Sequence, residues 1–304
     1  MSTADLLPRA ESLRSTRTPY VLATVVRAQR PTSAKPGDTA LVLPDGTVEG
    51  FVGGTCAEST VRLEGLRVLH SGQATLLRIA PDGGPQPAPE PTEGLVSVVN
   101  PCLSGGTLEI FLDPVTPPPL LQIFGAAPVA RALAQIGAAA GYATLVAAQG
   151  AAIPPDAVAV VVASHGHGEP EALRAAVAAG VDYIGLVASR RRGAAVLAEL
   201  DLAAGDRDRI HTPAGLDLGA RTPAEIAVTI LAEIIAARPR APERRSTVDG
   251  ESAGAVSAVD PVCGMEVAVT PTALHLAHGG RTWYFCGTGC RTAFADAPQR
   301  YPGA

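Results

Sequence analysis

Aromatic residues are scarce in this sequence and make up only 4% of its 304 residues. Hydrophobic residues still account for 47%, so we expect sizeable cores built mainly from alanine, valine, leucine and isoleucine. No apolar run approaches the ~20 residues that a membrane-spanning helix needs. The first residues also lack the basic start and apolar centre of a signal peptide, so we expect a cytoplasmic protein.

A basic excess and a disulfide framework are absent as well. The net charge of −5 and the isoelectric point near 5.7 argue against nucleic acid or a membrane surface as the partner. The five cysteines are an odd number. In a chain without a signal peptide, this count favours a reducing compartment, where thiols serve metal binding or chemistry instead of disulfides.

The chain divides by composition into three parts and a linker. Residues 1–116 contain alternating strand-like runs and one helical pattern, whereas residues 117–238 alternate strand and helix as βαβ units do. Residues 239–258 are polar and form a linker, and residues 259–304 carry three of the five cysteines. We therefore predict an α/β protein with a β-rich α+β N-terminal domain, a Rossmann-like parallel-sheet domain and a small cysteine-rich C-terminal domain.

Apolar periodicity places the main elements. We predict strands at 20–26, 40–43, 95–99, 108–112, 120–124, 144–146, 157–163 and 183–187, and helices at 58–70, 170–179 and 191–200. A further helix carries Val129, Leu133 and Ile136 on one face. The last one starts with Thr222 as N-cap, Pro223 in the first turn and Glu225 closing a capping box.

Two glycine pairs lie beside cysteines in the first domain. Gly53 and Gly54 precede Cys56, and Cys102 precedes Ser104, Gly105 and Gly106. Glycine pairs let successive backbone N–H groups face an anion, and a thiol beside them tends toward the thiolate. Tight turns with a small buried cysteine would give the same pattern. Three side chains of the preceding loop could add phosphate contacts or form an ordinary solvated turn: Thr32, Ser33 and Lys35.

These motifs together resemble the XdhC/CoxI family of accessory factors for xanthine dehydrogenase and carbon monoxide dehydrogenase. The similar segments of the first domain are PTSAKPG at 31–37, GFVGG at 50–54 and CLSGG at 102–106. Those of the second are SHGH at 164–167, YIGL at 183–186, SRRR at 189–192 and PAGLDLGARTPAEIA at 213–227. The resemblance implies that this protein binds molybdenum cofactor, as molybdopterin or its cytidine dinucleotide form, protects it during sulfuration and delivers it.

The same resemblance implies partners and roles. The partners would be an apo molybdenum hydroxylase and a cysteine desulfurase, and we also expect a homodimer. Gly53, Gly54, Gly105 and Gly106 would hold the anion, and Cys56 or Cys102 would contact the metal or its sulfur. No nucleophile–base pair or paired carboxylates are legible, so we expect an accessory factor and not an enzyme.

The second domain offers weaker sites. Gly125 keeps only the first glycine of a dinucleotide-binding turn, which disfavours the alternative of an NAD(P)-dependent oxidoreductase. Ser189, Arg190 and Arg191 open a helix after a strand, as a phosphate site or as a solvated basic helix start. His165 and His167 also follow a strand and could bind ligand, bind a metal or simply form a loop.

The C-terminal segment resembles the YHS/TRASH type of metal-binding domain. The similar runs are DPVCGM at 260–265 and WYFCGTGC at 283–290. Cys263, Cys286 and Cys290 would supply three soft ligands to zinc or copper, with a fourth from His275, His278, Asp260 or water. Three core thiols under an aromatic cluster are the alternative. If this domain governs function, the protein would be a metal sensor or metallochaperone.

Overall fold

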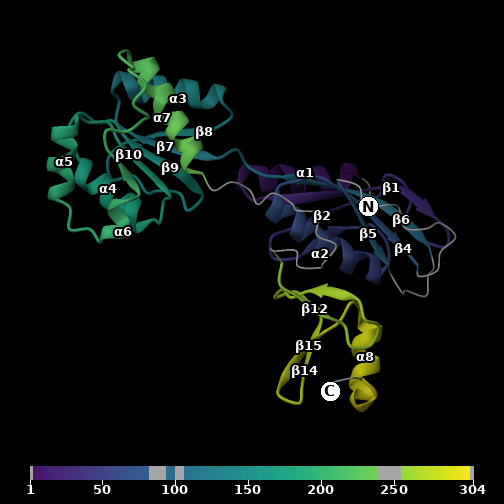
Figure 1. Ribbon diagram of the computed structural model, residues 1–304. Coiled ribbons are helices and arrows are strands. Elements are labelled where there is room, and N and C mark those ends of the chain that lie inside the picture. The colour runs from purple at the N-terminus through teal and green to yellow at the C-terminus, as the bar shows by residue number, and fades with distance from the viewer. Residues whose placement is uncertain (1–2, 82–93, 100–105, 239–254, 302–304) are drawn as a thin grey trace. The chain divides into compact units, whose positions relative to one another are not determined.

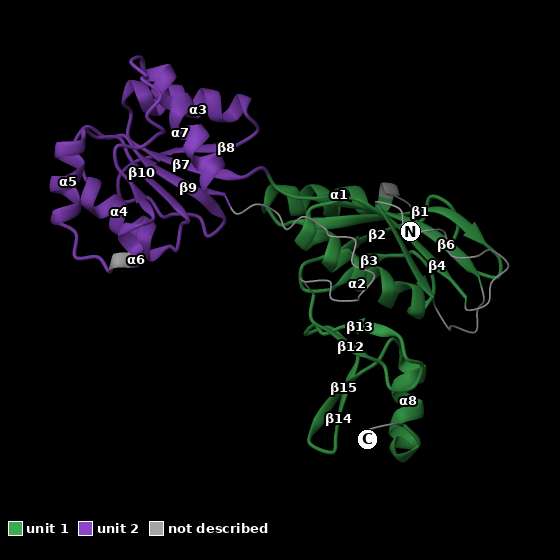
Figure 2. Cartoon of the chain, viewed as in Figure 1, with its two compact units in different colours: residues 1–117, 242–304 green, residues 118–241 purple. Residues whose placement is uncertain are grey.

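The computed structural model describes residues 3–81, 94–99, 106–238 and 255–301 (Figure 1). The chain forms two compact units, of which one combines residues 1–117 with 242–304 and the other holds residues 118–241 (Figure 2). Within the described residues, the helices are too short or too polar for any of them to cross a lipid bilayer.

The first unit is built on a six-stranded sheet of order β3-β2-β1-β6-β4-β5. Its strands are β1 (Tyr20–Gln29), β2 (Thr39–Val42), β3 (Val48–Gly50), β4 (Thr75–Ala80), β5 (Leu95–Val99) and β6 (Thr107–Val115). Neighbouring strands pair antiparallel except β4 and β5, which are parallel. The predicted strands at 20–26, 40–43, 95–99 and 108–112 are confirmed, and β4 is an addition.

Helices α1 (Thr3–Ser15) and α2 (Thr55–Ser71) pack on opposite faces of this sheet. The alternation of side chains along β1 explains the division, because Val21 and Ala23 lie in the core under α2 whereas Tyr20 lies in the core under α1. Val61 of α2 is fully buried there. The predicted helix at 58–70 is therefore confirmed, and it begins three residues earlier than its apolar pattern suggests.

The C-terminal segment consists of two short hairpins and one helix. Its elements are β12 (Ser257–Val259), β13 (Glu266–Ala268), β14 (His275–His278), β15 (Arg281–Tyr284), α8 (Thr288–Asp296) and the 3-10 turn η1 (Pro298–Arg300). Trp283, Phe285 and Phe294 form its aromatic core, with Phe294 fully buried. Strand β13 packs on α2, so this segment belongs to the first unit.

The second unit is a parallel five-stranded sheet of order β11-β10-β9-β7-β8. The strands are β7 (Leu120–Phe124), β8 (Ala143–Ala147), β9 (Ala157–Val162), β10 (Tyr183–Leu186) and β11 (Ile210–His211). The helices are α3 (Pro128–Ala139), α4 (Glu169–Ala178), α5 (Arg190–Ala198), α6 (Ala204–Arg207) and α7 (Pro223–Ala237).

Helices cover both faces of that sheet, which makes it a doubly wound, Rossmann-like domain as predicted (Figure 1). Leu133 of α3 and Ile230 of α7 pack on one face, and Leu173 of α4 packs on the other. The predicted capping box at the start of α7 is present, since Thr222 Oγ1 accepts the N–H of Glu225 at 3.2 Å and Glu225 Oε2 accepts the N–H of Thr222 at 2.9 Å.

Candidate cofactor and metal sites

Three of the predicted cofactor-binding segments meet at one end of the first sheet. Gly106, just before β6, lies against the loop that carries Thr32, Ser33 and Lys35, so a Cβ added there would collide with the carbonyl oxygen of Pro31. A Cβ added to Gly53 would lie 3.2 Å from Leu108 Cδ1 in β6. The close approaches that require these glycines therefore bring the loop after β1, the start of α2 and the start of β6 together.

The N-terminal end of α2 is open at this point. Gly54 is the N-cap residue and is exposed, and a Cβ added to it would meet nothing within 4 Å. Because glycine has no side chain, it cannot cap the first N–H groups of the helix, which stay available to an anion. Ser33 and Lys35 of the neighbouring loop are exposed, while Thr32 Oγ1 accepts the N–H of Ala34 at 3.2 Å.

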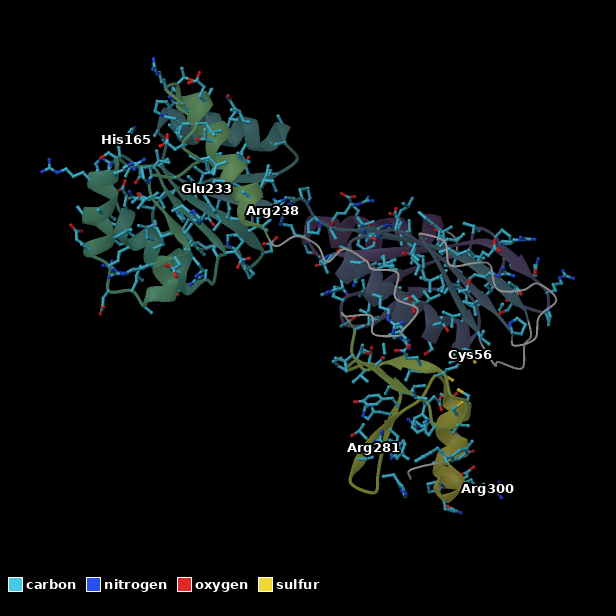
Figure 3. The ribbon with its side chains drawn as sticks, in the orientation of Figure 1. Cys56, His165, Glu233, Arg238, Arg281 and Arg300 are labelled. Carbon is cyan, nitrogen blue, oxygen red and sulfur yellow. The ribbon has the colours of Figure 1, made fainter. Side chains whose placement is uncertain are left out.

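Of the second glycine pair and its cysteine, only Gly106 can be described, because Cys102, Ser104 and Gly105 lie outside the described residues. Cys56, which follows the first glycine pair, is half-buried. It packs against Met265, Val267 and Cys286 of the C-terminal segment, and it lies where α2 meets that segment (Figure 3). The sequence did not predict this contact, because a local residue pattern carries no information about packing between segments more than 200 positions apart.

The three predicted C-terminal thiols come together with one carboxylate. Ligand atoms of Asp260, Cys263, Cys286 and Cys290 all lie within 4.8 Å of one another, and the sulfur of Cys286 is 3.6 Å from each of the other two sulfurs. Among the described residues, His275 and His278 are not part of this group. The sequence left four candidates for the fourth ligand: His275, His278, Asp260 and water. The geometry favours Asp260 over the two histidines.

The thiols differ in acidity. A hydrogen bond from the Cys286 thiol lowers the pKa of Cys263 to about 7, whereas the proton held in that bond, together with burial, raises the pKa of Cys286. Burial and the charge of Asp260 raise the pKa of Cys290 to about 12. Cys263 is therefore the first of the three thiols to lose its proton, at around pH 7, and a metal that binds all three sulfurs must displace protons from the other two.

In the second unit, the predicted residues lie at the carboxyl ends of the parallel strands. His165 and His167 are exposed in the loop after β9, and His165 is labelled in Figure 3. Buried Glu169 holds this loop, because it accepts the N–H of Gly166 at 2.9 Å and forms an ion pair with Arg192 from the first turn of α5. The two predicted segments, SHGH and SRRR, are therefore neighbours.

A cleft of about 570 Å³ lies beside the start of α5 and is lined by residues 187–190, 192, 213–220, 226 and 229. Ser189 is the N-cap residue of α5, with its Oγ accepting the N–H of Arg192 at 3.3 Å, and Arg190 pairs with Asp217 at 3.1 Å. Arg191 is exposed. The carboxylates that face Arg190 and Arg192 reduce the positive potential that an anion would meet here.

Gly125 has a packing role in this unit. It adopts a φ of +109°, and an added Cβ would collide with the carbonyl oxygen of Ala163 at the end of β9. The adjacent N-cap position of α3 is Ala127, which is 7% exposed. The one glycine retained from a dinucleotide-binding turn is thus explained by the contact between β7 and β9.

A polar network below the cleft was not predicted. Glu233 of α7 accepts hydrogen bonds from the Tyr183 hydroxyl and from the N–H of Gly215, both at 2.7 Å, and its other oxygen lies 3.1 Å from His211 Nδ1 (Figure 3). The Tyr183 and His211 rings stack with centroids 4.5 Å apart. Burial, assisted by the charge of Glu233, raises the pKa of Tyr183. The network ties the ends of β10 and β11 to α7.

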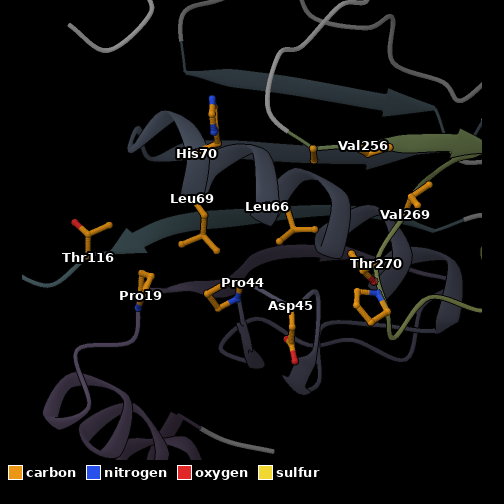
Figure 4. Close-up of a pocket in the computed structure, with 12 residues that line it drawn as sticks. Pro19, Pro44, Asp45, Leu66, Leu69, His70, Thr116, Val256, Val269 and Thr270 are labelled. Carbon is orange, nitrogen blue, oxygen red and sulfur yellow. The ribbon is translucent and has the colours of Figure 1, made fainter. Parts of the chain in front are cut away.

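A second cavity of about 470 Å³ lies in the first unit, between α2 and the C-terminal segment (Figure 4). Leu66, Leu69 and His70 of α2 line one wall, and Val269 and Thr270 line another. None of the predicted site residues that the structure describes is among its lining residues.

Comparison with known families agrees with this architecture. The model of the XdhC and CoxI family matches residues 13–80, that of the XdhC Rossmann domain matches residues 121–234, and that of the YHS domain matches residues 258–304. The chain therefore belongs to the XdhC and CoxI family and ends in a YHS domain.

Individual relatives are more distant. The chain is 28% identical over 270 residues to the uncharacterized protein YqeB of Escherichia coli (strain K12), and it spans about half of that protein's length, 47%, with 78% of its own. Over 53 residues, 17% of this chain and 6% of the relative, it is 45% identical to a copper-transporting P-type ATPase of Rhizobium leguminosarum bv. viciae. A crystal structure described as a xanthine dehydrogenase from Bacillus halodurans is similar at 19% identity and a TM-score of 0.37, over 80% of this chain and 98% of that one.

Proposed function

We propose that this protein is an accessory factor for the maturation of a molybdenum hydroxylase of the xanthine or carbon monoxide dehydrogenase type. In this role it binds molybdenum cofactor, shields it during sulfuration and delivers it to the apoenzyme. Family membership supports the accessory role. The observation that carries cofactor binding is the convergence of three motif segments on the open N-terminal end of α2.

The residues present fit such a group. A pterin cofactor carries a phosphate or pyrophosphate. The exposed Gly54 leaves the first backbone N–H groups of the 17-residue helix α2 accessible to such an anion. The exposed Ser33 and Lys35 supply a hydroxyl and a cation beside this end. When bound, the cofactor would supply a molybdenum centre with sulfur ligands. The chain's own residues would hold its anionic part and exclude solvent.

The second unit supports a binding role in place of turnover chemistry. The backbone of Ala163 packs directly against Gly125, the glycine of the turn after β7. The hydrogen bonds of Glu233 hold α7 to the sheet. We propose that the carboxyl ends of its strands form a cofactor-binding surface within this unit, made of Gly125, His165, His167, Ser189, Arg190 and Arg191. The partners in this proposal are the apo hydroxylase, a cysteine desulfurase and a second copy of the chain.

The C-terminal thiols are proposed to bind zinc or copper. Three sulfurs and a carboxylate oxygen within 4.8 Å of one another form a donor set for a soft cation. The similarity over 53 residues to a copper-transporting ATPase supports copper, and thiolate ligands would favour its Cu⁺ state. Equilibrium dialysis against Zn²⁺ and against Cu⁺ under reducing conditions would distinguish the two ions.

Cofactor binding is tested by filling the space above Gly54. A Cβ added at Gly54 meets nothing within 4 Å and its φ of −68° is ordinary for a side chain, so we expect Gly54→Val to fold while its side chain obstructs the approach to the helix end. Gly205→Val is the matched control, since it is also exposed and unobstructed but lies in the second unit. We expect Gly54→Val to lose at least about tenfold in pterin retained after gel filtration. Equal retention by both variants would remove this corner from the site.

A further inference from the structure

The C-terminal thiol group contains three sulfurs, and the carboxylate beside them, Asp260, already accepts two backbone hydrogen bonds. Asp260 is fully buried, and its two oxygens accept the N–H groups of Val262 and Cys286 at 2.9 and 2.8 Å. These bonds hold the Cys263 turn against the strand end that carries Cys286. A soft cation prefers thiolate to carboxylate oxygen, so Asp260 is better suited to orient two of the ligands than to be the fourth.

A fourth sulfur lies beside the group, on another domain. Cys56 of α2 packs against the buried cluster that Met265, Val267 and Cys286 form. Its sulfur is not among the ligand atoms that lie within 4.8 Å of one another. To join the centre, the half-buried side chain must turn about its Cα–Cβ bond and exchange its present interaction for the bond to the metal.

Two helices start at this junction, and each presents a cysteine in its first turn. Cys56 is the second residue after the N-cap Gly54 of α2, and Cys290 is the third after the N-cap Gly287 of α8. A Cβ added to Gly287 would lie 3.0 Å from Thr55 Cγ2, so the two helix starts are in contact. Since helix N-termini stabilise nearby negative charge, this arrangement favours a cluster of thiolates.

Separate contacts fix the two domains in this relation. Arg67 of α2 donates to Glu266 of β13 at 2.7 Å and to Glu64 at 2.6 Å. Thr272 Oγ1 donates to the carbonyl oxygen of Asp45 at 3.3 Å, in the turn between β2 and β3. Cys56 is therefore held next to the thiol group by bonds that do not involve any sulfur.

We propose that Cys56 is the fourth thiol ligand of a soft-metal centre, Zn²⁺ or Cu⁺, that is shared between the N-terminal domain and the C-terminal domain. Metal binding then displaces the thiol protons to solvent and forms four metal–sulfur bonds, from Cys56, Cys263, Cys286 and Cys290. The inference rests on the proposal that the C-terminal thiols bind a metal.

Cobalt substitution in the full chain tests the ligand count, because the sulfur-to-Co²⁺ charge-transfer absorbance rises with the number of thiolates. We expect Cys56→Ser to reduce this absorbance by roughly a quarter, one thiolate of four, and to weaken Zn²⁺ in competition with a chelator by at least about tenfold. Cys102→Ser, the same change at the remaining cysteine, is expected to leave both unchanged. A wild-type spectrum for Cys56→Ser would overturn the shared centre.

A second measurement needs no substitution. In the wild-type protein, Zn²⁺ is expected to protect Cys56 from iodoacetamide together with the three C-terminal cysteines, as read by mass spectrometry of the peptides. Alkylation of Cys56 at the same rate with and without Zn²⁺, while Cys263, Cys286 and Cys290 are protected, would overturn the inference and leave the C-terminal site intact. Failure of Zn²⁺ to protect any of the four would instead overturn the C-terminal metal site itself.

Discussion

Arg67 and Glu266 form an ion pair at 2.7 Å between residues that are 199 positions apart in the sequence. Arg67 is mostly buried and also forms an ion pair with the buried Glu64, which holds its guanidinium in place on α2. Its other partner, Glu266 of β13, is exposed to solvent. This relationship joins the YHS domain to the N-terminal domain in one unit. A substitution in this ion pair can therefore weaken the contact between the two domains without changing any cysteine.

The first prediction concerns that docking. Glu266→Gln removes the charge from the exposed partner and is expected to weaken the contact by about 0.5 kcal/mol, the usual range for a partly exposed ion pair. Hydrogen exchange should become faster in β13 and in the facing part of α2, and should stay unchanged in the second unit. Unchanged exchange in β13 would mean that the apolar contacts alone hold the domain.

The second prediction is the pH dependence of metal binding at the thiol group. Because the pKa of Cys263 is about 7 and those of Cys286 and Cys290 are raised, a metal displaces two protons from these three thiols above about pH 7 and three from them below it. Zn²⁺ affinity should therefore fall as pH decreases and should fall more steeply below about pH 7. A chelator competition series checks the slope, and a pH-independent affinity would contradict thiolate ligation.

The third prediction concerns the network around Glu233. Tyr183→Phe removes a hydrogen bond to a charged group and should lower the free energy of unfolding of the second unit by about 1.5–3 kcal/mol. The folded pKa of Tyr183 is raised, so its contribution is fully present below about pH 10, the unfolded value, and is lost as pH rises through the folded value.

Wild-type protein should consequently lose stability above about pH 10 more steeply than Tyr183→Phe. Hydrogen exchange in β10 and β11, followed in the full chain across this range, measures the difference. Parallel pH profiles for the two proteins would show that the Tyr183 hydroxyl does not carry the effect.

Much of this fold could be predicted from the sequence because local signals agreed with the tertiary structure. The apolar run of β9 and the Thr222–Glu225 capping box are local features, and both were recognised correctly. Strand β4 was missed because its apolar side chains at 76, 77 and 79 follow no strict alternation, although its burial alternates along the strand. Its place in the sheet is set by the neighbouring β6, a tertiary effect.

The candidate sites were predictable only in part, for the same reason. The spacing of Cys286 and Cys290 within one strand–helix turn is visible in the sequence, and so is the glycine pair before Cys56. The packing of Cys56 against the C-terminal segment and the hydrogen bond from Tyr183 to Glu233 join distant segments, and no local pattern encodes them. Single buried partners of this kind become visible only when the packing is known.

The fourth prediction compares two glycines that closely approach neighbouring backbone, Gly125 and Gly106, with Gly54, which does not. Gly125→Ala places a Cβ against the Ala163 carbonyl at a φ that disfavours side chains, and should destabilise the second unit by more than about 2 kcal/mol. Gly106→Ala should likewise destabilise the first unit. Circular dichroism melting checks both, whereas Gly54→Ala should melt as the wild type does.

The central claim, that the chain carries molybdenum cofactor, is tested most directly by measuring what the protein holds. Wild-type protein would be purified from a host that makes the cofactor, and its molybdenum content and oxidised-pterin fluorescence would be determined together. We expect near-stoichiometric amounts of both per chain. Protein that contains zinc or copper but neither molybdenum nor pterin would show that the chain does not carry the cofactor and would assign the function to the C-terminal thiols.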